Sequence, residues 1–335
     1  MLSEVLSALL CSNNDARRQA ESKFSNLLGQ NYFQTVQTLI EVLGNKTADI
    51  SIRALSGVLL RSAIEKHSKQ LNHESLSQLR AMFIKIWSEE TNAIIFRRLN
   101  HILAQLYTTE KWEEMIPTFI QIISNKDIKA SLPLLNLIEI LADYGPEYSQ
   151  ANLNNLGAFL GGAITANDAD IRIACARSIC SCIVGLDDET QRDSFRAALM
   201  PIMSVLGETL GAGNEADATS IMDHLVTIAN IQPVFFKGAT DSIVSSMLSV
   251  ANSTGLEYAT RTMAIEFLVT LGETAPALAR RCEFLVTGLI PILLTLVAGF
   301  DEEESVWVRD KYTDEVVEGD HTAGAYTYIF SLLSI

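Results

Sequence analysis

Apolar residues recur every three or four positions along most of the chain, in long segments separated by short polar joints. This spacing places apolar side chains on one face of an α-helix. The joints, such as residues 44–49, 88–92 and 165–170, are rich in Asn, Asp, Ser and Gly. These residue types commonly begin and end helices. No run of strict alternation is bounded by hairpin turns, which would indicate strands. The pattern therefore predicts an all-α protein.

The joints recur with a period near 40 residues. After many of them a basic residue opens the next apolar segment, namely Arg18, Arg53, Arg97, Lys129, Arg172 and Arg261. Successive members are 35, 44, 32, 43 and 89 residues apart, and the last interval is about two periods. A two-helix unit of about 40 residues is typical of HEAT-type repeats. We therefore expect a HEAT-repeat α-solenoid, a right-handed superhelix of antiparallel helix pairs.

About eight helix pairs fit this period. Neither helix of a pair can bury its apolar stripe alone, so the stacking of successive pairs completes the core. We expect the first helix of each pair (A) to line one face and the second helix (B) the other. The expected pairs cover residues 1–29, 30–68, 72–107, 111–145, 148–186, 190–231, 238–277 and 282–335. We interpret residues 1–335 as a single solenoid. Because its last apolar run, 325–335, has no polar cap, we also interpret it as the N-terminal part of a longer chain.

Prolines and glycines give finer expectations. Pro117, Pro201 and Pro291 fall in A helices, where a mid-helix proline would produce a kink. Glycine inside a helix costs about 1 kcal/mol relative to alanine, so we expect certain glycines to be kept because they let neighbouring A helices approach closely. These glycines are Gly157, Gly161, Gly162 and Gly207. The basic residues that open the B helices have two interpretations, a structural ladder along the joints or contacts with a partner.

Negative charge is concentrated near the end of the chain. The 335 residues carry a net charge of −15, and residues 301–320 hold nine carboxylates and two cations, a net charge of −7. Such a block predicts a solvated loop, here inserted in the eighth repeat, and poorly ordered without a partner. It is either a solubilising linker or a binding surface, and its two aromatic residues favour the second interpretation. The expected binding residues are Asp301, Glu302, Glu303, Glu304, Trp307, Asp310, Tyr312, Asp314 and Glu315.

Composition and motifs argue against several other functions. The acidic balance argues against direct nucleic-acid binding, which needs clustered Lys and Arg. The five cysteines show no metal-binding spacing, so we expect buried free thiols and no metal site. Motifs of nucleotide binding, nucleophilic catalysis and zinc proteolysis are absent from the sequence, and we expect no enzyme activity and no cofactor. The uncharged run 284–300 is short for a membrane span, so we expect no membrane insertion.

Several segments resemble the importin-β superfamily of karyopherins. Residues 16–24, ARRQAESKF, are similar to the start of that superfamily's N-terminal domain. Residues 263–281, MAIEFLVTLGETAPALARR, then LIPILLTLV and the acidic run, resemble the importin β-3 (importin 5) branch. The strict repeat consensus has an aspartate six residues before the B-helix arginine, and this residue is mostly missing here, with Thr47 and Ala166 in its place. The resemblance spans the whole chain and is most specific at residues 257–310.

This resemblance implies a nuclear transport receptor that shuttles through nuclear pores between cytoplasm and nucleus, and we expect a monomer. Such receptors bind the GTP form of the Ran GTPase through B helices. They bind phenylalanine-glycine (FG) nucleoporins through A helices, here about those of the fifth to seventh pairs. They also bind basic cargo proteins, and the acidic loop would contact Ran or such cargo. The implied Ran-binding residues are Arg17, Glu21, Arg53, Ser56, Arg98 and Gln105.

The main alternative is a HEAT-repeat scaffold subunit of another complex, of the phosphatase scaffold or coat adaptor type. Regular scaffold repeats do not need a strongly acidic insertion with a tryptophan, so residues 301–320 favour the receptor. A helical-repeat enzyme would need a convergent acid–base or cationic groove, which the sequence does not indicate.

Overall fold

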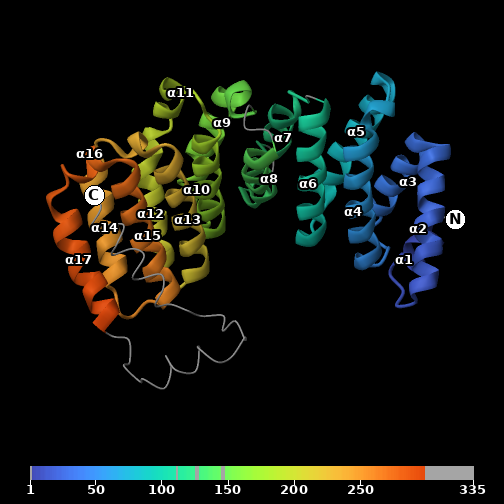
Figure 1. Cartoon of the computed structure of the whole chain (residues 1–335). Helices are drawn as coiled ribbons and strands as arrows, with labels where there is room; N and C mark the ends of the chain where they lie inside the picture. The colour runs from blue at the N-terminus through green and yellow to red at the C-terminus, as the bar shows by residue number, and fades with distance from the viewer. Residues whose placement is uncertain (1, 111, 125–127, 145–147, 299–335) are drawn as a thin grey trace, which may run out of the picture. The chain divides into compact units, whose positions relative to one another are not determined.

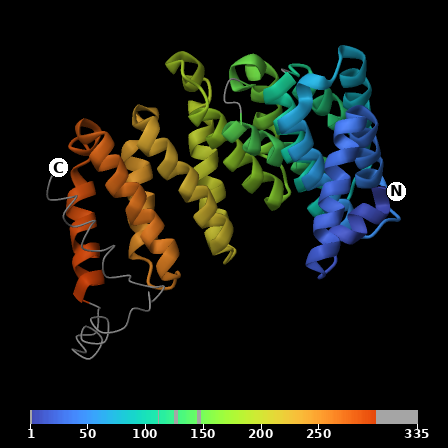
Figure 2. The same cartoon turned by 45° about the vertical axis from the view of Figure 1, so that its right-hand side comes forward.

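The computed structural model describes residues 2–110, 112–124, 128–144 and 148–298, and it is built of α-helices joined by short turns (Figures 1 and 2). None of these residues lies in a β-strand, which confirms the all-α prediction. The helices group into two units, residues 1–186 and 187–335.

The first unit contains five helix pairs in the predicted order. B helices of successive pairs pack directly on one another, α4 on α6, α6 on α8, and α8 on α10. Their shared interface holds fully buried side chains such as Leu60, Ile64 and Leu103, and each contributes about 1.5–3 kcal/mol through burial. The helices are α1 (Leu2–Leu9), α2 (Asn14–Gln30), α3 (Tyr32–Gly44), α4 (Ile50–His67), α5 (His73–Glu89), α6 (Ala93–Glu110), α7 (Met115–Ser124), α8 (Leu132–Tyr144), α9 (Tyr148–Ala163) and α10 (Ala169–Val184), with 3-10 turns η1 (Ser68–Gln70) and η2 (Ile128–Ser131).

The second unit continues the same alternation. Its B helices α13 and α15 pack side by side, and α14 packs against both α15 and α17. Phe236 and Phe267 meet edge to face in this core, with ring centroids 5.2 Å apart. The elements are α11 (Glu189–Asp193), η3 (Arg196–Ala198), α12 (Leu199–Gly211), α13 (Glu215–Ile231), η4 (Pro233–Phe236), α14 (Thr240–Asn252), α15 (Tyr258–Thr274), α16 (Pro276–Ala279) and α17 (Glu283–Ala298).

The repeat period is visible in where the B helices begin. From α4 onward they start at residues 50, 93, 132, 169, 215 and 258, at intervals of 43, 39, 37, 46 and 43 residues. These intervals bracket the HEAT period and exceed the 34 residues of a tetratricopeptide unit. The expected polar joints supply the N-caps, since the side chains of Asn13, Asn72, Asp168 and Asn214 accept hydrogen bonds from the first backbone N–H groups of their helices.

Two hydrogen bonds link neighbouring repeats across a sequence separation of about one period. Ser178 Oγ donates to the carbonyl oxygen of Leu135 at 2.8 Å, from α10 to α8. Thr274 Oγ1 donates to the carbonyl oxygen of Ala229 at 2.7 Å, from α15 to α13. Both bonds join adjacent B helices, so polar groups fix the register of surfaces that are otherwise held by apolar contacts.

The basic residues that open B helices divide into two groups. Arg53 Nε and Arg261 Nε each donate to a carbonyl ten residues earlier, Leu43 O at 2.8 Å and Ala251 O at 2.9 Å. These carbonyls end the preceding A helices, so both arginines cap them as the structural interpretation expects. Arg172 Nη1 donates to the carbonyl oxygens of Ala166 and Asn167 in the joint before α10, at 2.7 and 3.0 Å, so it too makes structural contacts. Arg18 and Arg97 are exposed instead. The side chain of Lys129 lies outside the part of the chain that the structure describes.

The proline prediction is wrong for two of three positions. Pro117 and Pro201 are each the third residue of their helix, α7 and α12. Backbone N–H groups of the first turn have no intrahelical partner, so a proline there removes no hydrogen bond. Pro291 alone of the three lies inside a helix, α17.

The glycine prediction is also wrong. A Cβ at Gly157, Gly161, Gly162 or Gly207 would meet nothing within 4 Å, so these positions are open. Close approach occurs at other glycines instead. A Cβ on Gly57 of α4 would lie 3.1 Å from the Cβ of Arg98 on α6, where these two B helices cross.

A buried ion pair ties the second repeat to the third. Arg53, 4% exposed, contacts the carboxylate of Glu90, which is 7% exposed and follows α5. Burial opposes the charge of Glu90, but hydrogen bonds from the backbone N–H groups of Asn92 and Thr91 and from Arg53 hold its pKa below the usual value. The nearby Lys46 Nζ donates to the carbonyl oxygen of Glu89, a second link between the same two joints.

The C-terminal predictions fall partly beyond the described residues. The helix α17 provides the A helix of the eighth pair, and residues 299–335 lie outside the part that the structure describes. The single solenoid, the acidic insertion and its order without a partner therefore stay predictions. Among the described residues, no helix combines the length and hydrophobicity that crossing a membrane requires.

We expect Gly57→Val to lower the free energy of unfolding by about 1–3 kcal/mol, because the added side chain overlaps Arg98 at the α4–α6 crossing. The matched control is Gly207→Ala, which should raise stability by about 1 kcal/mol because the position is open and alanine favours helix. Urea unfolding of both variants measures the difference. Equal stability of the two variants would contradict the close approach.

We expect Glu90→Gln to destabilise the chain by about 3 kcal/mol at neutral pH, since it leaves the buried charge of Arg53 without its partner. The folded-state pKa of Glu90 is lowered, so its contribution is present above the pKa of the unfolded state and disappears as pH falls through the folded value. Unfolding measured from neutral to strongly acidic pH should therefore show the difference from wild type shrinking in acid. Glu89→Gln at the exposed neighbouring position should change stability by less than about 0.5 kcal/mol. A difference that is constant with pH would argue against this account.

Candidate partner-binding surfaces

The B helices of the first three pairs carry the residues implied to bind Ran. On α2, Arg17 and Glu21 are both exposed, and Arg17 donates a hydrogen bond to the side chain of Asn14. On α6, Arg98 is exposed and Gln105 is half-buried. These four residues lie on helices that the repeat stacking holds in order along one unit.

Two of the implied residues lie inside the stack instead. Arg53 is engaged by Glu90 and by the carbonyl of Leu43, as described above. Ser56 is fully buried, and its Oγ donates to the carbonyl oxygen of Arg53 at 2.7 Å. Both side chains are buried and make their contacts within the chain, so neither is accessible to a partner.

A groove between α2 and α4 was not predicted from the sequence. It has a volume of about 370 Å³, with Phe24 and Leu28 of α2 facing Leu59 of α4. Glu21 lies on one side of it and Lys66 on the other. Apolar surface flanked by opposite charges suits a protein partner, because buried apolar contacts supply affinity and the charges supply orientation. The sequence pattern assigns Leu28 and Leu59 to apolar stripes and gives no sign that both remain half-exposed.

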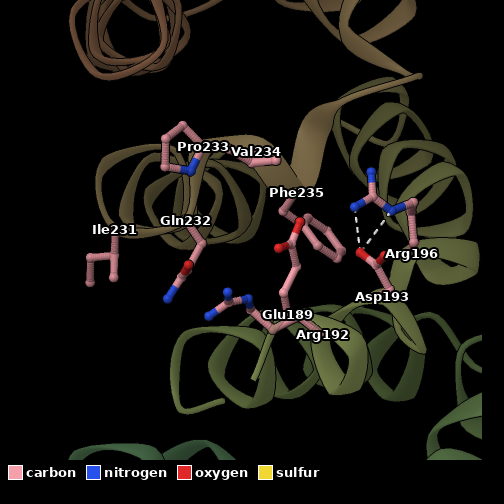
Figure 3. A pocket seen from close by; sticks show the side chains of 9 residues that line it. All are labelled: Glu189, Arg192, Asp193, Arg196, Ile231, Gln232, Pro233, Val234 and Phe235. Carbon is pink, nitrogen blue, oxygen red and sulfur yellow. Dashed lines mark hydrogen bonds and ion pairs between the residues drawn. The ribbon is translucent and has the colours of Figure 1, made fainter. Parts of the chain in front are cut away.

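A second pocket lies in the other unit, where η4 begins the seventh pair beside α11 of the sixth (Figure 3). Its volume is about 200 Å³. Of its lining residues, Ile231 and Val234 are 51% and 50% exposed, whereas Phe235 is buried. This pocket falls within the fifth to seventh pairs, the region in which the resemblance implies FG pockets.

Three of the four charged side chains that line this pocket have partners within the chain, and one of them is Arg192, whose Nη1 donates to the carbonyl oxygen of Asp187 at 3.1 Å. Arg196 pairs with Asp193, donates to the carbonyl oxygen of Lys237 at 2.7 Å, and stands over the Phe235 ring at 5.8 Å (Figure 3). These contacts fasten η4 to the end of the sixth pair's first helices. The exposed aliphatic rim is therefore the part of the pocket that is best suited to an incoming side chain.

Four of the five cysteines are buried, whereas Cys11 is half-buried, so the expectation of buried thiols fails at that position. Cys175, Cys180 and Cys182 of α10 are fully buried free thiols, as expected. Burial raises the pKa of the Cys175 and Cys180 thiols well above the usual range, so both stay protonated. In the described ranges, His, Cys, Asp and Glu do not gather in groups of three or more that would suit a metal ion. The described surfaces offer apolar contacts and charged side chains to a partner.

Comparison with known proteins identifies the family. A model of the "Importin repeat" matches residues 253–327, and a model described as "IPO5-like, TPR repeats" matches residues 97–246. Importin subunit beta-3 of Saccharomyces cerevisiae is 23% identical over 97% of this chain and 31% of its own length. A probable importin-5 homolog of Dictyostelium discoideum is 20% identical over 92% of this chain and 29% of its own length.

Solved structures show the same fold. The crystal structure of Kap121p has a TM-score of 0.82 and 20% identity, covering 99% of this chain and 32% of that chain. Kap121p bound to RanGTP has a TM-score of 0.79 and 19% identity, covering 98% of this chain and 31% of that one. The chain thus spans just under a third of the proteins it matches. Together with the two family models, which cover most of its residues, these likenesses place the chain in the importin-β superfamily of karyopherins.

Proposed function

We propose that this chain is part of a nuclear transport receptor that carries basic cargo proteins into the nucleus. It binds Ran-GTP and FG-nucleoporins, shuttles between cytoplasm and nucleus, and acts as a monomer. One observation carries the proposal. The chain follows the fold of Kap121p bound to RanGTP over 98% of its length, and it keeps an exposed B-helix surface in its first unit.

The proposed Ran surface combines the implied residues that are accessible with the α2–α4 groove. Arg17, Glu21, Arg98 and Gln105 supply charged and polar contacts. The groove supplies the apolar surface that stable interfaces need, and Leu59 is the large aliphatic side chain that α4 contributes to it. Arg53 and Ser56 contribute indirectly, because their buried contacts hold α4 in position.

The proposed FG contacts lie on the A-helix side of the second unit. The pocket beside η4 is lined by the exposed Ile231 and Val234 and the buried Phe235, and its Arg196 is already paired with Asp193. An aromatic side chain from a partner would bury apolar surface there without displacing an ion pair. A structure of Kap121p bound to Nup53p shares this fold, with a TM-score of 0.77 and 19% identity.

Residues 301–320 are proposed to attract basic cargo or Ran. A net charge of −7 over twenty residues speeds the approach of a positively charged surface, and salt screens the attraction. The aromatic pair Trp307 and Tyr312 would then anchor the complex. Kap121p bound to Pho4p is a structural relative, with a TM-score of 0.78 and 19% identity.

The scaffold alternative has weaker support. The relatives matched by sequence are importins, which transport proteins and are not enzymes. Membership of their superfamily favours a receptor over a phosphatase scaffold or a coat adaptor subunit. Co-purification with a phosphatase catalytic subunit or with coat components would favour the alternative.

We expect the chain to bind Ran loaded with a non-hydrolysable GTP analogue far more tightly than Ran-GDP. Leu59→Glu should weaken binding of the GTP form about tenfold or more, because it places a charge in the apolar groove. Lys85→Glu, at an exposed position on the A helix α5, is the control and should leave binding within about twofold. Calorimetry with all three proteins measures the affinities. Equal binding of both nucleotide forms would refute Ran recognition, and equal loss in both variants would refute the groove.

We expect the triple variant Glu302→Gln, Glu303→Gln and Glu304→Gln to slow association with a lysine-rich cargo peptide about twofold or more at low ionic strength. The matched control neutralises the exposed Glu113 and Glu114 and should have a smaller effect. Stopped-flow measurements in rising salt test the cause, because screening at about 1 M salt should remove the difference. A rate that is insensitive to both the substitution and salt would exclude the acidic segment as the attracting element.

A further inference from the structure

The first helix pair carries a groove that the second pair does not cover. Its volume is about 440 Å³, and all of its described lining comes from α1 and α2. The second, third and fourth pairs each pack against a neighbouring pair on both sides, so stacking leaves this groove open in the first pair. The apolar part of the lining is Val5, Ala8, Ala16, Ala20 and Leu27, and the polar part is Glu4, Gln19, Lys23, Asn26 and Gln30.

This groove and the proposed Ran surface lie on opposite sides of α2. Successive residues of a helix are rotated by about 100° around its axis. Gln19, Lys23 and Leu27 are four residues apart and therefore share the side of α2 that lines the groove. Glu21 is two residues from Lys23, so the two side chains point about 160° apart. A partner bound in this groove would thus leave the α2–α4 groove free.

Lys23 gives the groove a positive charge that the chain does not neutralise. It is exposed, and none of the described residues forms an ion pair with it. The other charged lining residue, Glu4 of α1, already interacts within the chain. The side-chain amides of Gln19 and Asn26 lie beside Lys23 and can both donate and accept hydrogen bonds. A carboxylate at the edge of an apolar surface is therefore the complementary group.

The walls of the groove favour a helix over an extended segment. Both walls are α-helices, whose backbone groups are already paired, so an extended chain would find no strand edge to join. A docked helix satisfies its own backbone groups and fills the groove with a ridge of side chains, as neighbouring helices do within the stack. The lining runs from Ala16 to Gln30 along α2, which is about 21 Å or about four helical turns.

We propose that the α1–α2 groove binds an amphipathic helix of a partner protein, with an aspartate or glutamate of that helix beside Lys23. The apolar stripe of the partner helix lies against Ala8, Ala16 and Leu27, which are half-buried and so remain accessible. The partner helix takes the place that a neighbouring pair takes elsewhere in the stack. This inference goes beyond the proposed transport function, because the surfaces assigned to Ran, FG segments and cargo do not include this groove.

The test uses the whole chain and a fluorescent synthetic peptide of about 18 alanine-rich residues, long enough to form a helix. Leucines at every third or fourth position form its apolar stripe, and glutamates line one edge of that stripe. We expect saturable binding by fluorescence anisotropy, and a loss of about tenfold when serines replace the leucines. Lys23→Glu should weaken binding about fivefold and should strengthen binding of a peptide with lysines in place of the glutamates.

Arg18→Glu is the matched control. It makes the same change of charge at an exposed position of α2, about 140° around the helix from Lys23. It should bind the glutamate peptide within about twofold of wild type. Both variants should melt close to the wild-type temperature, because both positions are exposed, and this measurement separates lost binding from lost folding.

Three results would overturn the proposal. These are no saturable binding of the leucine peptide, equal losses in Lys23→Glu and Arg18→Glu, or no effect of Lys23→Glu with either peptide. Sedimentation of the chain alone tests a different occupant. A concentration-dependent dimer that Lys23→Glu abolishes would assign the groove to a second copy of the chain and would also overturn the proposal. The Ran measurement concerns the opposite side of α2, so either proposal can fail without the other.

Discussion

The structure depends on the inability of a single helix pair to bury its own apolar stripe. Within each unit, B helices from α4 onward cover one another, as α4 and α6 do and as α13 and α15 do. Burial is therefore shared between neighbours, and the loss of one interface weakens two repeats. Hydrophobic attraction between helices has no preferred direction. Hydrogen bonds spaced by one period, such as the one from Ser178 to the carbonyl of Leu135, do have one and so fix the register of the helices.

This constraint also decides which surfaces remain for partners. Grooves form where neighbouring elements diverge, as between α2 and α4 or between α7 and α9. Each of these two grooves thus belongs to two pairs at once, and its width follows their spacing. A partner that prefers one width would favour one arrangement of the pairs, which is the physical requirement for coupling between binding sites.

The sequence predicts the helix pairs well because their signals are local. Apolar periodicity and Asn or Asp N-caps depend on a few neighbouring residues, and the structure has both. It does not predict which basic residue faces inward, because adjacent positions on a helix differ by about 100°. Arg53 is buried whereas Arg97 and Arg98 are exposed, although all three occupy similar places in the pattern. The space around a glycine is equally hard to predict. Whether a Cβ would be free, as at Gly161, or would contact another helix, as at Gly57, depends on residues far away in the sequence.

The buried ion pair of Arg53 and Glu90 shows how a contact inside the stack can position a surface helix. Ion pairs in the interior are often no more stable than apolar residues of the same volume, so stability alone is a weak reason for one here. This pair is specific in geometry, since Arg53 must reach both Leu43 O in its own repeat and Glu90 in the next. Arg53 stands four residues before Gly57 on α4, so the pair holds this helix in place close to where it crosses α6 at Arg98. We infer that two residues implied as contacts, Arg53 and Ser56, serve the B-helix surface by setting the position of the helix that carries it.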